Sequence, residues 1–457
     1  MFNQESICIH FIGIGGIGMS GIAEVLLSLG HQVSGSDIME SPRTQGLQRS
    51  GAKIFIGHKE ENLQRPTVVV YSSAIKENNP EFIGAKKRKI PLMKRAEMLA
   101  ELMRLNKKGI AIAGTHGKTT TTSFLATILQ ESSLDPTYII GGVVNNLNGH
   151  AKTGGGDLLV VEADESDGSF LLLNPTMSVI TNIDDDHMDF YQSKEELVNA
   201  FHQFANKVPF YGCCALNADD EKSMLIKGNM KKPWITYGVE DGNSAEFSAK
   251  NIRHFPYKTE YDLYYKNEFA EQIVIKLPGI HNVSNSLGAI SLAFNMKISF
   301  KQISQAIEKF EGVDRRLDIL FDNGKLEVID DYAHHPTEIN KTLEIIRNTR
   351  KDSTIIVVFE PHRFSRTKYC WNSFLHCFNH ADRLFLGPIY PASEKPIDGI
   401  NTERMVEDIN HLHPNFARLL NNLDEMPLSL DDYGKVSLVT LGAGSIGKKV
   451  REFIKRL

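Results

Sequence analysis

Short apolar runs alternate along the chain with longer stretches in which apolar residues recur at helical spacing. Residues 6–12 form an apolar, strand-like run that enters a glycine-rich turn, and the residues after the turn predict a helix through Leu29. Further apolar runs, each short enough for a buried strand, occupy residues 32–35, 68–73, 158–161, 177–181, 326–329, 354–359, 383–386 and 436–441. Strands that alternate with helices predict an α/β fold, in which mostly parallel sheets lie between layers of helices.

Two polar segments interrupt this alternation. The polar and basic residues 106–108 and the charged residues 313–316 each separate one run of strands and helices from the next. Between them, residues 235–277 alternate polar and apolar positions, which predicts a β-rich insertion. A chain of 457 residues is long enough for about three domains. We therefore expect three domains, at residues 1–107, 108–314 and 315–457.

A phosphate-binding loop is predicted where an apolar strand meets a helix after residue 113. The loop contains Gly114 and Gly117, and the helix begins with Lys118 and Thr119. Backbone N–H groups and a helix N-terminus face phosphates in such loops, the lysine adds a positive charge, and the hydroxyl after it reaches a metal ion. The strict motif has a glycine where this chain has Ile112, so the loop is a variant. The alternative is a glycine-rich turn that serves only packing.

Two further glycine-rich turns follow predicted strands. The turn Gly13–Gly18 precedes a helix, a second strand and Asp37, which is the outline of a dinucleotide-binding unit. This pattern fits NAD or the pyrophosphate of any nucleotide diphosphate. The turn Gly442–Gly447 is followed by only ten residues, too few for a partner strand and its acid. We expect that turn to serve helix packing or to cap another ligand.

Acidic residues follow two strands of the middle domain. Glu162, Asp164 and Glu165 come directly after one strand, and the acid-rich segment 182–187 follows the next. Ligands of open α/β sheets bind beyond the carboxyl ends of the strands, and a divalent cation there needs oxygen ligands. These acids are therefore candidate metal ligands, although each one alone could be a solvated loop residue.

Two histidine- and arginine-containing segments follow strands of the last domain. His334 and His335 lie beside two aspartates, but neighbouring residues of one strand point to opposite faces. We therefore favour contacts with a substrate over a shared zinc ion. Arg363 and Arg366 are three residues apart, so on a helix they would share a face and could clamp a carboxylate or phosphate. The alternative is a solvated basic face.

The bulk composition excludes some classes of protein. Apolar residues make up 41% of the chain and charged residues 23%, as in ordinary globular proteins, and the net charge of −5 argues against nucleic acid as a partner. No apolar run approaches the roughly 20 residues of a membrane span, and no signal peptide is evident. The five cysteines form no CxxC pair, which fits a reducing cytoplasm.

Ten motifs stand in the order found in the Mur ligases, and together they cover essentially the whole chain. They read GIGGIGMSG, VSGSD, GTHGKTTTT, EADESD, TNIDDDHMD, PGIHNVSN, GVDRR, DDYAHHPTE, EPHRFSR and GAGSIG. The chain therefore resembles this family. The resemblance implies a Rossmann-like N-terminal domain for a UDP-sugar, a central P-loop ATPase-type α/β domain with a β-rich insertion, and a Rossmann-like C-terminal domain for an amino acid.

Within the family, the motifs are most similar to those of the branch that joins L-alanine to UDP-N-acetylmuramate. This resemblance implies an ATP-dependent amide-bond-forming ligase of cytoplasmic peptidoglycan synthesis, with ATP and Mg²⁺ as cofactors and an acyl-phosphate intermediate. The nearest alternative is the recycling branch that adds a whole tripeptide. An NAD-dependent dehydrogenase and a non-catalytic nucleotide-binding scaffold are more distant alternatives, because they leave Lys118 and its neighbours without a role.

The resemblance also implies roles for individual residues. Those expected at the UDP-sugar are Gly15, Gly16, Gly18, Asp37, Ser72 and Ser73. Those expected at ATP are Gly114, Thr115, Gly117, Lys118, Thr119, Thr120, His281, Asn282, Asn285, Arg315 and Asp331. Those expected at the amino acid are Tyr332, His334, Arg363 and Arg366.

The metal ligands and catalytic residues follow from the same resemblance. The expected metal ligands are Thr119, Glu162 and His187, of which His187 rests on the resemblance alone because Mg²⁺ prefers oxygen. The expected catalytic residues are Lys118, Arg315 and, as general base, His334.

Overall fold

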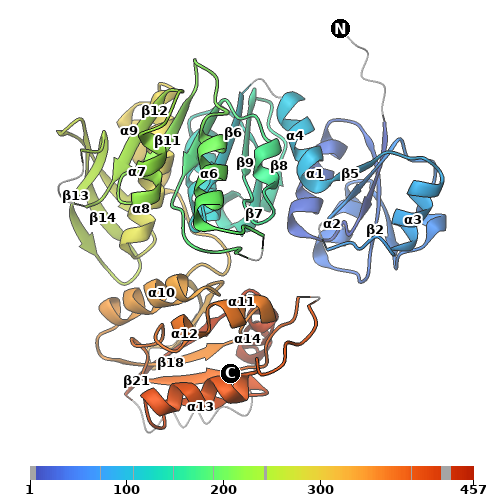
Figure 1. Cartoon of the computed structure of the whole chain (residues 1–457). Coiled ribbons are helices and arrows are strands. Elements are labelled where there is room, and N and C mark those ends of the chain that lie inside the picture. The colour runs from blue at the N-terminus through green and yellow to red at the C-terminus, as the bar shows by residue number, and fades with distance from the viewer. Residues whose placement is uncertain are drawn as a thin grey trace. The chain divides into compact units, whose positions relative to one another are not determined.

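The computed structural model describes residues 7–72, 74–105, 108–147, 149–188, 190–240, 244–392, 394–423 and 434–456. The chain forms two compact units (Figure 1). The first unit comprises Met1–Ile252, Glu260–Ile275 and Ile280–Glu311, and the second comprises Arg253–Thr259, Lys276–Gly279 and Gly312–Leu457. Within the described residues, no helix is long and apolar enough to span a membrane.

The first sheet is a five-stranded parallel sheet in the order β3-β2-β1-β4-β5, with helices packed around it. Its strands are apolar where they are buried, and Ile9 and Phe11 of β1 have no exposed surface. The elements are β1 Cys8–Ile12, α1 Ile17–Ser28, β2 Gln32–Asp37, α2 Pro42–Arg49, β3 Lys53–Ile56, η1 Glu60–Asn62, β4 Val68–Tyr71, α3 Pro80–Lys87, β5 Leu92–Lys94 and α4 Arg95–Leu105.

The second sheet has ten strands in the order β15-β14-β13-β12-β11-β10-β6-β9-β7-β8. Its first elements are β6 Lys108–Ala113, α5 Lys118–Glu131, β7 Thr137–Val144, η2 Asn145–Leu147, β8 Gly149–Lys152, β9 Leu158–Glu162, η3 Ser169–Leu172, β10 Met177–Ile180 and α6 Lys194–Ala205. The later ones are β11 Cys213–Asn217, α7 Glu221–Lys227, β12 Trp234–Gly238, β13 Phe247–His254, β14 Thr259–Tyr265, β15 Glu268–Ile275, α8 Ile280–Asn295 and α9 Phe300–Glu308. The expected β-rich insertion is therefore present.

The first two sheets share one hydrophobic core. Buried residues of β1 and α1 belong to the same cluster as residues of β6 and β9, and α1 packs against β7 and β8. The polar contacts between these two parts include Ser20 Oγ to His150 Nε2 at 3.0 Å and Arg95 to Asp164 at 3.1 Å.

The second unit contains a six-stranded sheet in the order β16-β17-β21-β18-β19-β20, in which only β16 runs antiparallel to its neighbour. Its elements are β16 Asp318–Asp322, β17 Leu326–Asp331, α10 Pro336–Thr349, β18 Ser353–Phe359, α11 Phe364–Tyr369, α12 Trp371–Phe374, β19 Arg383–Leu386, α13 Thr402–Leu412, β20 Ala417–Leu419, β21 Lys435–Leu441 and α14 Ile446–Ile454. The three sheets confirm the predicted α/β fold class.

Candidate active site

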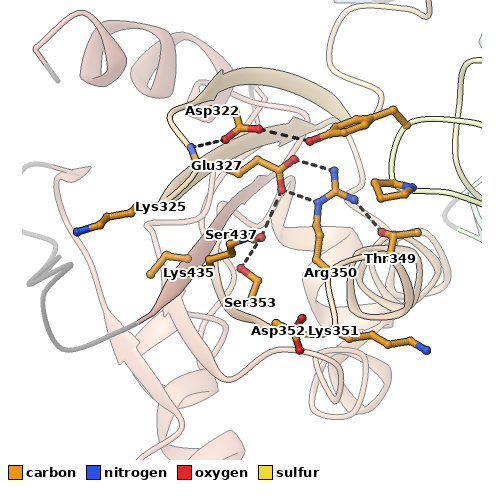
Figure 2. Close-up of a pocket in the computed structure, with 14 residues that line it drawn as sticks. Asp322, Lys325, Glu327, Thr349, Arg350, Lys351, Asp352, Ser353, Lys435 and Ser437 are labelled. Atoms are coloured by element: carbon orange, nitrogen blue, oxygen red, sulfur yellow. Dashed lines mark hydrogen bonds and ion pairs between the residues drawn. The ribbon is translucent and has the colours of Figure 1, made fainter.

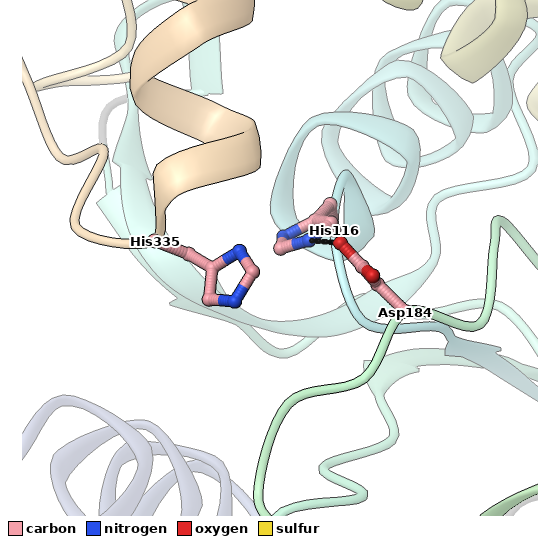
Figure 3. Close-up of side chains that lie close together, drawn as sticks. All are labelled: His116, Asp184 and His335. Carbon is pink, nitrogen blue, oxygen red and sulfur yellow. Dashed lines mark hydrogen bonds and ion pairs between the residues drawn. The ribbon is translucent and has the colours of Figure 1, made fainter. Parts of the chain in front are cut away.

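The predicted phosphate loop joins β6 to α5. Its two glycines adopt backbone angles that favour glycine, with φ of 134° at Gly114 and 84° at Gly117. The end of the neighbouring strand β10 supports the loop, because Asn182 accepts hydrogen bonds from the backbone N–H groups of Thr115 and His116, both at 3.0 Å. His116 also contacts Asp184, with Nε2 3.0 Å from Oδ2 (Figure 3).

A methyl group at Gly114 would not fit this loop. A Cβ there would lie 2.0 Å from Thr181 Oγ1 and close to two backbone nitrogens, on a backbone that already requires a positive φ. We expect Gly114→Ala to destabilise the first unit by about 2–4 kcal/mol, since overpacking and a positive φ both add to the cost. Thermal unfolding measures the change. Gly46→Ala is the matched control, because Gly46 lies in α2 with open space around it, and an equal loss in both variants would contradict the expectation.

Lys118 is the first residue of α5 and makes a two-pronged ion pair. Its Nζ lies 3.0 and 2.8 Å from the two carboxylate oxygens of Glu165, which is almost fully buried. Burial raises the pKa of Glu165 to about 7. Burial lowers the pKa of Lys118, but the nearby carboxylates of Glu165 and Asp164 outweigh this effect and raise it. Lys118 is therefore held as a cation at the start of the helix.

Thr119 and Glu162 form a compact set of oxygen donors beside the lysine. The Thr119 hydroxyl donates to Glu162 Oε2 at 3.1 Å, and the other oxygen of Glu162 accepts from the Gly141 N–H group at 2.5 Å. A hydroxyl and a carboxylate held this close suit Mg²⁺, which prefers hard oxygen ligands. The Nε2 atom of His187 lies 3.5 Å from Asp186 and 3.8 Å from Glu165.

Helix α8 contributes Asn285 to the phosphate loop. A Cβ on Gly117 would lie 2.3 Å from Asn285 Oδ1, so the side chain touches the loop backbone at its second glycine. Asn282, one turn earlier, is buried as well, and His281 is partly exposed. Thr120 is buried in the first turn of α5. The structure thus brings the predicted asparagine segment against the predicted loop.

The first glycine turn is held by Asp37 at the end of β2. Its carboxylate accepts hydrogen bonds from the Gly15 N–H and Ile38 N–H groups, both at 2.8 Å. The Gly15 carbonyl accepts from Arg43 Nε at 2.7 Å. Asp37 therefore fixes the turn through hydrogen bonds from backbone N–H groups to its carboxylate. Gly16 is the residue before α1, and Ser72 lies next to Gly13.

Gly18 and Ser73 are the two remaining residues of the predicted UDP-sugar site. Gly18 lies in the first turn of α1, where an added Cβ would lie 3.1 Å from an Arg95 guanidinium nitrogen. Ser73 lies outside the described residues.

In the second unit, Arg315 is built into an internal network. Its Nε donates to Asp330 at 3.1 Å, one Nη donates to the Gly442 carbonyl at 2.5 Å, and its guanidinium lies 5.1 Å from the centre of the Tyr332 ring. Asp330 is fully buried and also accepts from Arg451 at 2.8 Å. In this structure Arg315 therefore ties the segment after residue 312 to the end of β21.

Asp331 and His334 organise the loop between β17 and α10. Asp331 accepts from the backbone N–H groups of Leu317 and Ala333, and burial raises its pKa to about 6. His334 Nδ1 lies 3.0 Å from the Tyr332 carbonyl. Because a carbonyl only accepts, this contact requires a proton on Nδ1, so that Nε2 is the acceptor in the neutral form of the ring.

The segment before α11 corrects one expectation. Arg363 and Arg366 do not share a helix face, since α11 begins at Phe364 and Arg363 stands before it with φ 73° and ψ 136°. The physical reason is a strand-like contact, in which the Arg363 N–H group donates to the Tyr390 carbonyl at 2.8 Å. Arg366 is in the helix and is only 9% exposed.

His362 joins the two predicted amino-acid-binding segments. Its ring stacks on Tyr390, lies 5.8 Å from the ring of His334, and has Nδ1 3.5 Å from a guanidinium nitrogen of Arg366. Burial lowers the pKa of His362 to about 3, assisted by His334 when that ring is protonated and by the positive charges of Arg366 and Arg363. The sequence motifs DDYAHHPTE and EPHRFSR thus meet at one neutral histidine, which lies within the second motif but has no predicted role of its own.

The second glycine turn binds a carboxylate of the same chain. Glu360, at the end of β18, accepts from Ser445 Oγ at 2.6 Å and from the Ile446 N–H group at 3.1 Å, which is the first N–H of α14. Lys449 lies 3.3 Å from the same carboxylate. A Cβ on Gly444 would lie 2.3 Å from Glu360 Oε1. The N-terminus of α14 at this turn is therefore occupied by Glu360, in the position of an anion.

A polar pocket of about 270 Å³ lies at the opposite ends of these strands (Figure 2). It is lined by residues at the amino ends of β17, β18 and β21, and a buried ion pair lies within it, with Glu327 2.5 and 2.8 Å from Arg350. Lys325 and Lys351 point away from each other, so their charges do not converge. The predicted substrate residues follow the carboxyl ends of the strands instead.

Three family models match successive parts of the chain. The model for the Mur ligase family, catalytic domain, matches residues 8–107, and that for the Mur ligase middle domain matches residues 112–293. The model for the Mur ligase, glutamate ligase domain, matches residues 315–433.

Curated relatives and solved structures resemble the chain over nearly its full length. A UDP-N-acetylmuramate–L-alanine ligase of Trichlorobacter lovleyi is 46% identical over 98% of both chains. One of Aquifex aeolicus is 46% identical over 98% of this chain and 97% of its own. The crystal structure of a UDP-N-acetylmuramate–alanine ligase from Thermotoga maritima has a TM-score of 0.84 and 29% identity, covering 98% of this chain and 99% of that one.

Proposed function

Because the chain belongs to the Mur ligase family, we propose that it joins L-alanine to the lactyl carboxylate of UDP-N-acetylmuramate at the expense of ATP. The observation that best supports this activity is the 46% identity to ligases of that name over 98% of both chains. We propose that the reaction is a cytoplasmic step of peptidoglycan synthesis. Residues 1–107 would bind the UDP-sugar, residues 108–314 ATP, and residues 315–457 the amino acid.

The reaction has two chemical steps. A carboxylate does not condense with an amine at neutral pH, because its oxygen is a poor leaving group. The lactyl carboxylate first attacks the γ-phosphorus of ATP, which forms an acyl phosphate and releases ADP. The amine of alanine then attacks the acyl carbon, the amide bond forms, and inorganic phosphate leaves.

The first unit supplies the groups for the phosphoryl transfer. Two negatively charged reactants must meet, so Lys118 offsets their repulsion and the charge that develops in the transition state. Thr119 and Glu162 would hold Mg²⁺, with His187 as a further candidate, and the ion would neutralise phosphate charge when bound. Gly114 and Gly117 let the loop pack closely against Thr181 and Asn285, because a Cβ at either position would collide with those side chains.

The second unit supplies the groups for the amine. Arg363 and Arg366 would bind the carboxylate of alanine and so orient its amine. The ammonium group has to lose a proton before it attacks, and Nε2 of His334 is the candidate acceptor, since Nδ1 of that ring faces the Tyr332 carbonyl.

Phosphate release tests the proposed function. We expect release from ATP only when UDP-N-acetylmuramate and L-alanine are both present, because each reactant is needed for one of the two steps. Omitting either one is the control, and equal turnover without the sugar nucleotide would contradict the proposal. If the tripeptide replaced L-alanine as the preferred acceptor, the recycling branch of the family would be the correct assignment.

A further inference from the structure

The loop after β19 is held against residues 361–363 by strand-like hydrogen bonds. The Tyr390 N–H group donates to the Pro361 carbonyl at 2.8 Å, and the Tyr390 carbonyl accepts from the Arg363 N–H group at 2.8 Å. The ring of Tyr390 stacks on His362, with centres 5.5 Å apart and planes 9° apart. The backbone of Arg363 is thereby fixed in its unusual conformation.

Four residues later, Glu394 reaches the same segment through its side chain. Its carboxylate accepts hydrogen bonds from the Ser365 N–H group at 2.9 Å and from Ser365 Oγ at 2.6 Å, and it forms an ion pair with Arg363, whose Nε lies 2.9 Å from Oε1. The Glu394 side chain is 22% exposed and that of Arg363 34%, so solvent screens this ion pair less than a surface pair. These hydrogen bonds and the charge of Arg363 hold the pKa of Glu394 below its usual value despite partial burial.

The contact through Nε determines how the guanidinium is presented. An arginine has five N–H donors, and Nε carries one of them. The other four lie on Nη1 and Nη2, and a bidentate ion pair uses two parallel N–H groups of the fork. An unrestrained arginine side chain must lose rotamer freedom whenever it binds a ligand. A carboxylate that holds Nε removes much of that freedom beforehand.

We propose that Glu394 is a positioning residue for the amino-acid substrate. It holds Arg363 by Nε, so that the Nη1–Nη2 side of the guanidinium is presented to the substrate carboxylate. This inference rests on the proposed function, in which Arg363 binds that carboxylate. Glu394 does not itself touch the substrate, and its effect is transmitted through Arg363. Immobilising one long side chain in advance corresponds to an affinity gain of about 5- to 10-fold.

Steady-state phosphate release on the full chain tests the role. We expect Glu394→Ala to raise the KM for L-alanine by about 5- to 10-fold, and Glu394→Gln to raise it less, since the amide retains an acceptor oxygen. The KM values for ATP and UDP-N-acetylmuramate and the kcat should stay within about twofold. An unchanged KM for L-alanine, or an equal rise in all three KM values, would overturn the positioning role.

Glu327→Gln is the matched control. Glu327 and Arg350 form an ion pair in the same unit, but at the amino ends of the strands (Figure 2). This variant should lower the melting temperature and leave the KM for L-alanine unchanged. If it raised that KM as much as Glu394→Ala does, general loosening of the unit would explain both results and the proposal would be wrong. Should Glu394→Ala fail to fold, Glu394→Gln decides the question alone.

An Arg363→Ala background separates a transmitted effect from a direct one. If Glu394 acts through Arg363, adding Glu394→Ala to Arg363→Ala should change the KM for L-alanine by no more than about twofold. If the increases in KM for L-alanine caused by the two substitutions instead multiplied in the double variant, the positioning role would be overturned. Turnover of the wild-type enzyme on L-alanine distinguishes a failure of the proposed function from a failure of the role of Glu394 alone. Without any turnover on L-alanine, the proposed function fails and the role of Glu394 fails with it. With normal turnover but unaffected Glu394 variants, only the role of Glu394 fails.

Discussion

Replacing Lys118 by alanine is expected to reduce ligase turnover by about 10²- to 10³-fold or more. Lys118 provides a cation at the start of α5, where the phosphates are expected and where negative charge develops during transfer. Its Nζ is held within 3.0 Å of both oxygens of Glu165, so the charge is already in place and needs no reorganisation. Phosphate release with all three substrates present is the measurement.

The fold of this variant should survive. Removing the ammonium group leaves Glu165 buried, but burial already raises the pKa of that carboxyl to about 7, so it can take up a proton instead of remaining an unpaired charge. Circular dichroism checks this point. Lys152→Ala is the matched control, since Lys152 forms a more exposed ion pair with Asp135 at 2.9 Å in the same unit. Retention of more than about a tenth of the activity by Lys118→Ala would contradict its assigned role.

Arg363→Ala is expected to raise the KM for L-alanine by about 10- to 100-fold, the range for losing hydrogen bonds to a charged group. The KM for ATP should not change, because the residue is assigned to the amino acid alone. Arg363→Lys should give an intermediate loss, since it keeps the charge but not the planar fork. Steady-state kinetics with L-alanine as the varied substrate provides the values.

The control for Arg363 is an exposed arginine of the same unit. Arg404, in α13, is 56% exposed and lies 3.8 Å from Asp408, so Arg404→Ala should leave all three KM values unchanged. An Arg363→Ala enzyme with a normal KM for L-alanine would show that the substrate carboxylate binds elsewhere. A loss of kcat without a change in KM would assign Arg363 to the transition state instead of to substrate binding.

The fold class was predictable because buried parallel strands are continuous apolar runs that end in polar residues. The run predicted at 383–386 is β19 with the same bounds, and those at 354–359 and 436–441 begin one residue later than β18 and β21. The candidate site was predictable for the same reason, since polar residues after such strands gather at one edge of a sheet.

Contacts between distant parts of the chain were not predictable from local patterns. The spacing of Arg363 and Arg366 suggests a shared helix face, but a hydrogen bond to Tyr390, 27 residues later, holds Arg363 outside the helix. Local pattern also gives no reason to prefer Glu165 over its acidic neighbours as the partner of Lys118. Both choices depend on which loops meet after the sheets have formed.

Glu360 occupies the position at the second glycine turn where an anionic ligand would bind. A helix N-terminus that opens on a glycine turn attracts an anion, and at α14 the chain supplies that anion from the end of its own strand. An external phosphate would have to displace a buried carboxylate that is only 3% exposed. Two turns of one pattern in this chain therefore do not amount to two nucleotide sites. Whether a glycine-rich turn binds a nucleotide depends on whether an acid of the same fold already occupies the N-terminus of the helix that follows the turn.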